Sequence, residues 1–70
     1  MKKLDRHTFA IWSFEYDRTS GIYTKDALFD NLMEEDKKDY LDEADYYLSS
    51  SNIELPFDII ERAQKEDYEV

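Results

Sequence analysis

The sequence contains no cysteine, one glycine, one proline and one histidine among its 70 residues. Without cysteine it has no disulfide to strengthen a small core and no cysteine–histidine set for structural zinc. No stretch approaches the roughly 18 apolar residues that span a bilayer, and the N-terminus lacks the apolar run of a signal peptide. These absences favour a cytoplasmic protein that uses no metal or cofactor.

The chain also lacks the residues of covalent catalysis, which needs an activated nucleophile beside a base. His7 lies in a basic N-terminal stretch, and the serines at 49–51 are typical of a helix end. Carboxylates are plentiful, but a catalytic pair needs a pocket that separates the two pKa values. We therefore expect a protein that is not an enzyme.

The segment 17–28 resembles the calcium loop of the EF-hand family, with oxygen-bearing residues near a glycine. If Asp17 takes the first position of such a loop, Leu28 falls at the twelfth. If Gly21 takes the sixth, Ala27 falls at the twelfth. Both registers lose the glutamate that calcium needs there, so we interpret the segment as an ordinary connection.

What the sequence has is a helical spacing of apolar residues. It predicts an all-α fold, a compact bundle of three to four short helices in a single domain that spans residues 1–70. The segment 5–17 is ambiguous. Phe9, Trp12 and Tyr16 form a helical stripe, while alternate residues of the same segment are also apolar or aromatic. The alternative is a small α+β fold with a short N-terminal hairpin.

The expected helix boundaries follow from a few residues that favour caps and turns. Asp5 or Thr8 is a plausible N-cap for the first helix, and Gly21 suits the position just after its end. The second helix is expected to start at Thr24. It would bury four apolar side chains, which are Leu28, Phe29, Leu32 and Met33.

A third helix is the most clearly patterned, and the serines and Asn52 of segment 49–52 are expected to end it. Its predicted buried stripe consists of Tyr40, Leu41, Ala44, Tyr47 and Leu48. A fourth helix opens at Pro56, with the ion pairs Asp58–Arg62 and Glu61–Lys65 at i, i+4. We expect residues 66–70 to fray. A chain this small buries a thin core, so either aromatic packing or a homodimer must reinforce it.

Charge is unevenly distributed along the chain, whose formal net charge is −9. The first 25 residues carry five bases and three acids, whereas residues 26–45 carry nine acids and two bases. Such a surface repels nucleic acid and anionic membranes and attracts basic protein surfaces. The segment after Pro56 could complete a helix-turn-helix, but it carries more acids than bases, and phosphate contacts need the opposite sign.

The acids of the third expected helix recur along its polar side, about 5–6 Å apart along the axis. This separation resembles that of phosphates along a nucleic-acid strand. The side chains expected to bind a partner are Glu35, Asp39, Asp42, Glu43, Asp45 and Tyr46. The plainer interpretation of the same acids is an ordinary solvated helix face.

These features predict a small acidic inhibitor that occupies the basic nucleic-acid site of a partner protein. In size, charge and mechanism it is similar to the DNA-mimic antagonists of phages and mobile elements, such as anti-restriction and anti-CRISPR proteins. No residue motif ties the chain to one family. The alternative is a helical adaptor that docks through exposed aromatic side chains such as Trp12, Phe14 and Tyr16.

Overall fold

The computed structural model describes residues 2–50 and 53–69, so Met1, Ser51, Asn52 and Val70 lie outside the described residues. The elements follow in the order β1 (Lys2–Lys3), α1 (Arg6–Thr19), the 3-10 helix η1 (Phe29–Asn31), α2 (Glu34–Ser49), α3 (Phe57–Lys65) and β2 (Tyr68–Glu69). The predicted all-α class is confirmed, because three α-helices make up most of this compact fold.

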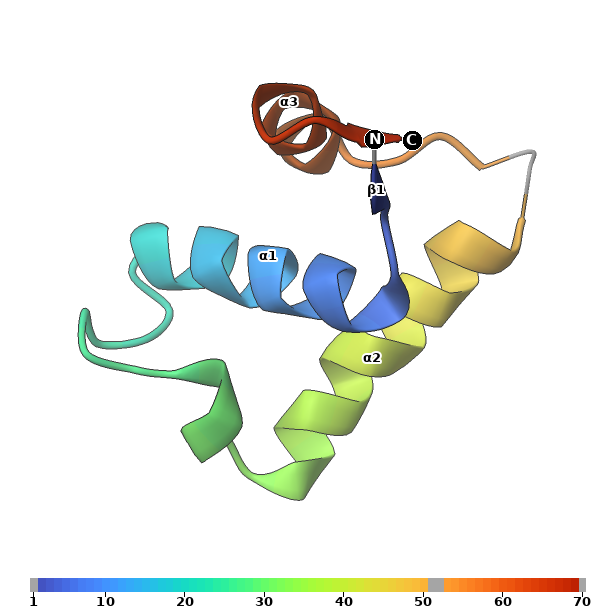
Figure 1. Ribbon diagram of the computed structural model, residues 1–70. Coiled ribbons are helices and arrows are strands. Elements are labelled where there is room, and N and C mark those ends of the chain that lie inside the picture. The colour runs from blue at the N-terminus through green and yellow to red at the C-terminus, as the bar shows by residue number, and fades with distance from the viewer. Residues whose placement is uncertain (1, 51–52, 70) are drawn as a thin grey trace.

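Helix α1 is the central element of the fold, with α2 and α3 on different sides of it (Figure 1). Phe9 and Trp12 of α1 pack with Ile59 of α3, while Ala10 and Phe14 pack with other partners. This burial on more than one side explains why segment 5–17 fits two patterns. A helix with core on both sides does not show a single apolar stripe. The larger of the two core clusters consists of Leu4, Phe9, Trp12, Ala44, Ile59 and Ala63.

Both ends of α1 are capped as the sequence predicts. The Asp5 carboxylate accepts a hydrogen bond of 2.7 Å from the Thr8 backbone N–H at the N-terminus. At the other end Gly21 adopts φ 94°, a left-handed conformation that favours glycine. The N–H groups of Gly21 and Ile22 donate to the carbonyls of Arg18 and Asp17, both at 3.1 Å.

Replacing Asp5 with alanine is expected to cost about 1 kcal/mol of unfolding free energy, because the cap bond is lost. The hydrogen bond from the Thr8 backbone lowers the pKa of Asp5 below its ordinary value of 3.8. The cap therefore contributes its full stabilisation at pH values above 3.8, and this stabilisation disappears as the pH falls through the lowered pKa of Asp5. Urea unfolding of both proteins should differ at neutral pH and converge in strong acid. An equal difference at both pH values would contradict the capping role.

The helix expected from Thr24 does not form, and this prediction is wrong. One 3-10 turn, η1, replaces it, and Leu28 and Met33 are exposed. The Arg18 guanidinium donates a 2.8 Å hydrogen bond to the Ala27 carbonyl, which an α-helix would need for the N–H of Asn31. That N–H bonds to the Leu28 carbonyl instead, which closes a 3-10 turn and buries Phe29.

Helices α2 and α3 match their predicted positions but not every predicted contact. Helix α2 ends at Ser49 as expected, but Ala44 is its only fully buried residue and Leu48 is 37% exposed. Helix α3 follows Pro56, and its Glu61–Lys65 pair forms at 3.4 Å. Arg62 does not pair with Asp58. It contacts carboxylates of α1 and of the next helical turn instead.

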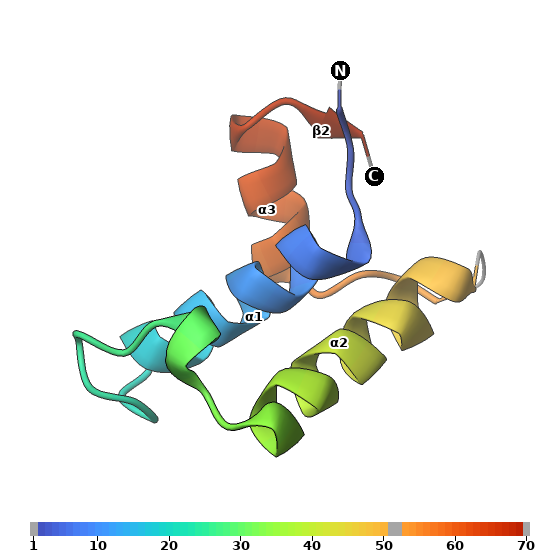
Figure 2. The same ribbon diagram turned by 60° about the horizontal axis from the view of Figure 1, so that its bottom comes forward.

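The two ends of the described chain lie side by side (Figures 1 and 2). Strands β1 and β2 pair in parallel, with Lys2 opposite Tyr68 and Lys3 opposite Glu69. This differs from the hairpin considered above and from the expected fraying of residues 66–69. The Tyr68 ring packs edge-on against Trp12, with centroids 5.1 Å apart, and so holds the segment on the core. Among the described residues, no helix combines the length and apolar character that a membrane span requires.

Candidate protein-binding surface

The six predicted partner-binding residues all lie on α2 and are all exposed, but they do not form one row. The Asp45 carboxylate accepts two hydrogen bonds from the Arg6 guanidinium, at 2.7 and 2.9 Å. Hydrogen bonding to Asp45 and the negative charge of Asp45 raise the pKa of Arg6. This bidentate pair neutralises Asp45 and removes it from the free carboxylates of the helix.

Glu35 and Asp42 lie beside basic residues. Lys38 lies 3.8 Å from the Asp42 carboxylate. A shallow hollow of about 440 Å³ on this side is of mixed charge, because it is lined by Arg6, Glu34, Glu35, Lys37, Lys38, Leu41 and Asp42. We define the outer face of α2 as Glu35, Asp39, Asp42 and Tyr46. Nearby basic side chains neutralise part of its negative charge. Tyr46 is 61% exposed on it.

The edge of α2 turned away from the hollow of mixed charge carries only negative charge. Asp36, Asp39 and Glu43 follow one another at i, i+3 and i+7, a spacing that places them on one side of a helix. They border two hollows that meet at Glu43, one of about 190 Å³ and one of about 210 Å³. We call the two together the acidic groove; its lining consists of Ser13, Tyr16, Asp17, Tyr23, Asp36, Asp39, Tyr40, Glu43, Pro56, Asp58 and Ile59.

A half-buried tyrosine hydroxyl fixes one carboxylate of the acidic groove. Tyr40 donates a 2.6 Å hydrogen bond from its hydroxyl to Asp17 Oδ2, and its oxygen lies 3.4 Å from that of Tyr23. Burial and the bond to Asp17 raise the pKa of Tyr40 well above its ordinary value. Asp17 is therefore held in place by a neutral donor.

The carboxyl group of Glu43 is affected by the acids around it. Burial, followed by repulsion from Asp17 and Asp58, raises the pKa of its carboxyl above the ordinary value. Ionised Glu43 therefore costs the folded state free energy, and the cost disappears as pH falls through the raised pKa.

Replacing Glu43 with glutamine is expected to stabilise the fold at neutral pH, by less than about 1 kcal/mol because solvent screens a half-exposed group. The two proteins should unfold at the same temperature in acid, where Glu43 is protonated. Thermal unfolding followed by circular dichroism over a pH series measures this. Loss of stability in the variant at neutral pH would show that Glu43 is not under repulsion.

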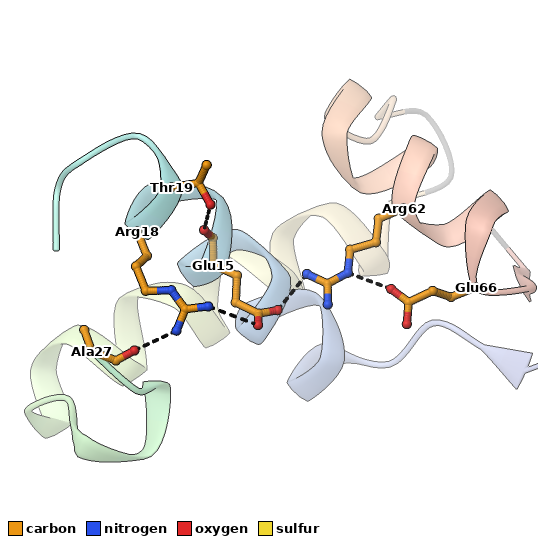
Figure 3. A network of polar contacts seen from close by, with 6 residues as sticks. All are labelled: Glu15, Arg18, Thr19, Ala27, Arg62 and Glu66. Atoms are coloured by element: carbon orange, nitrogen blue, oxygen red, sulfur yellow. Dashed lines mark hydrogen bonds and ion pairs between the residues drawn. The ribbon is translucent and has the colours of Figure 1, made fainter. Parts of the chain in front are cut away.

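The arginines that could neutralise the acidic groove are engaged elsewhere. Arg62 and Arg18 both contact Glu15, at 2.6 and 3.6 Å, and Arg62 also pairs with Glu66 (Figure 3). Arg6 is held by Asp45. Within residues 2–50 and 53–69, no lysine or arginine forms an ion pair with the five acids of the groove, which are Asp17, Asp36, Asp39, Glu43 and Asp58.

Comparisons with family models, with curated proteins and with solved structures gave no match for this chain. In the part of the chain that the structure describes, no group of three or more histidine, aspartate or glutamate side chains is placed to bind a metal ion.

Sequence reasoning found Asp39 and Glu43 of the acidic groove but missed its other acids. Asp36 shares their helical spacing and could have been found from that period. Asp17 and Asp58 come from α1 and α3, and nothing in the sequence indicates that they approach α2. Of the aromatic side chains that the adaptor alternative expects at the surface, Trp12 and Phe14 are buried in the core, whereas Tyr16 is 55% exposed.

Proposed function

We propose that this protein is a small acidic inhibitor that binds the basic nucleic-acid site of another protein and blocks it. The observation that carries the proposal is the segregation of charge in the folded chain. Five carboxylates from three helices border two hollows that share Glu43, while each arginine is paired with acids outside them. A negative concave surface attracts cationic side chains and repels nucleic acid.

The outer face of α2 extends this surface, because Asp39 belongs to both. Solvent-facing acids at helical spacing can contact a row of lysines and arginines that otherwise binds phosphates. Exposed Tyr46 adds apolar area with a polar end, which suits a protein interface. Such a target belongs in the cytoplasm, and its class is that of the restriction, CRISPR or transcription enzymes that phage antagonists block.

The test compares two double variants with the same change in net charge. Asp39→Lys with Glu43→Lys reverses the acidic groove, whereas Asp26→Lys with Asp30→Lys reverses exposed acids of the 24–33 loop. A target captured from lysate at low salt is identified and purified, and its nucleic-acid binding is measured with each protein added. We expect inhibition by the wild type and the loop variant, and a loss of at least about tenfold in affinity for the groove variant.

Salt provides a second readout, because exposed charge contacts weaken as the Debye length falls from about 10 Å at 0.1 M to 3 Å at 1 M. Capture should be steeply salt-dependent. The proposal fails if the target still binds nucleic acid while saturated with this protein, or if both double variants lose activity equally, since only total charge would then matter.

A further inference from the structure

The larger hollow of the acidic groove lies where all three α-helices meet. Ser13, Tyr16 and Asp17 come from α1, Glu43 comes from α2, and Asp58 and Ile59 come from α3 beside Pro56. Its volume of about 210 Å³ is smaller than the roughly 300–1,000 Å³ of sites for drug-sized ligands. The hollow therefore suits a single side chain of a partner better than a drug-sized molecule.

Charge determines which side chain fits. Asp17, Glu43 and Asp58 surround the hollow, and no base lines it. These three carboxylates form no group placed to bind a metal ion, but an organic cation with several donors can hydrogen-bond to carboxylates that lie further apart. The raised pKa of Glu43 agrees with this, because burial and then its two acidic neighbours disfavour its charged form, and a bound cation would relieve the repulsion.

The remaining lining distinguishes arginine from lysine. Tyr16 is 55% exposed at the hollow, and Pro56 and Ile59 add apolar surface. A guanidinium is flat and weakly hydrated, stacks on aromatic rings and donates in several directions at once. An ammonium is a compact and strongly hydrated charge, which loses more on entering a partly apolar hollow.

We propose that this hollow receives an arginine side chain of the partner protein, held by Asp17, Glu43 and Asp58 against Tyr16. This inference rests on the proposed function, since it specifies the partner chemistry at the acidic groove. It makes the groove selective for arginine, whereas the outer face of α2 attracts any basic surface.

Two peptides of equal charge, hexa-arginine and hexa-lysine, separate these contributions. Each is titrated into the 15N-labelled full chain, and the amide shifts report where it binds. We expect hexa-arginine to bind at least about threefold more tightly and to perturb Tyr16, Asp17, Glu43 and Asp58. The double variant Glu43→Gln with Asp58→Asn should bind both peptides equally. Asp26→Asn with Asp30→Asn is the matched control, because it removes the same two charges from exposed acids outside the groove, and it should keep the preference.

The outcomes separate this inference from the proposed function. Equal binding of both peptides by the wild type, or shifts confined to the outer face of α2, would overturn the arginine site but leave an acidic binding surface. Absence of binding by either peptide at low salt would count against both. The amide variants keep the side-chain shapes and remove repulsion, so they should remain folded, and circular dichroism verifies this.

Discussion

Replacing Phe14 with alanine is expected to remove roughly a third or more of the free energy of unfolding. Phe14 is 1% exposed, and its ring centroid lies 5.0 Å from that of Tyr23 and 6.0 Å from those of Phe29 and Tyr40. Deleting a buried phenylalanine ring costs about 3–5 kcal/mol. At about 0.05–0.15 kcal/mol per residue, the whole fold has only about 4–10 kcal/mol.

The matched control is the same substitution at Phe57, which is 77% exposed on α3 and should change stability by less than about 0.5 kcal/mol. Urea unfolding of both variants measures the contrast. If Phe14→Ala is unfolded even without urea, it shows no unfolding transition. In that case Phe14→Leu, which keeps most of the apolar volume, should show a cooperative transition at a lower urea concentration than the wild type. Equal stability of the Phe14 and Phe57 alanine variants would contradict the assigned core.

Replacing Arg62 with methionine is expected to cost about 2 kcal/mol and to loosen α3. The Arg62 guanidinium contacts Glu15 at 2.6 Å and Glu66 at 2.7 Å (Figure 3), and it lies 4.9 Å from the centre of the Trp12 ring. Hydrogen bonds to charged groups are worth about 1.5–3 kcal/mol, and a cation over an aromatic ring adds about 0.5–1. Partial exposure of the Arg62 side chain places the expected loss in the lower part of that range.

Lysine at position 62 keeps the charge but cannot contact two carboxylates as a planar fork, so it should recover only part of the loss. Lys65→Ala is the control on the same helix, because its pair with Glu61 is exposed and worth less than about 1 kcal/mol. Hydrogen exchange locates the change. Faster exchange in α3 for the Arg62 variant alone is expected, and uniform acceleration would indicate that Arg62 does not act specifically on α3.

The sequence predicted the elements better where the signal is local. Asp5, Gly21 and the serine at 49 mark helix ends through their own backbone and side-chain chemistry, and all three predictions are confirmed. The helical spacing of apolar residues in α2 is also a signal that lies within one segment. The failure at 24–33 has a long-range cause, since Arg18 takes the Ala27 carbonyl that a helix would have used. No pattern within the segment reveals that competition.

The surface likewise has features that depend on local sequence and features that depend on long-range packing. Excess acid in residues 26–45 is visible in the sequence, but which carboxylates stay unpaired depends on where three arginines lie after folding. In the sequence Asp45 is equivalent to Asp39, but in the fold Arg6 pairs with Asp45. The contribution of Asp17 and Asp58 arises only from the packing of α1, α2 and α3.

The parallel pairing of Lys2–Lys3 with Tyr68–Glu69 brings the beginning and end of residues 2–69 to one place. Each strand has two residues, so the distance from one end of the pair to the other is only about 7 Å. A domain with this arrangement can be inserted into a surface loop of a host protein with little separation of the two junctions. The fold is thus suited to insertion into a host protein, because the points where the chain enters and leaves it lie close together.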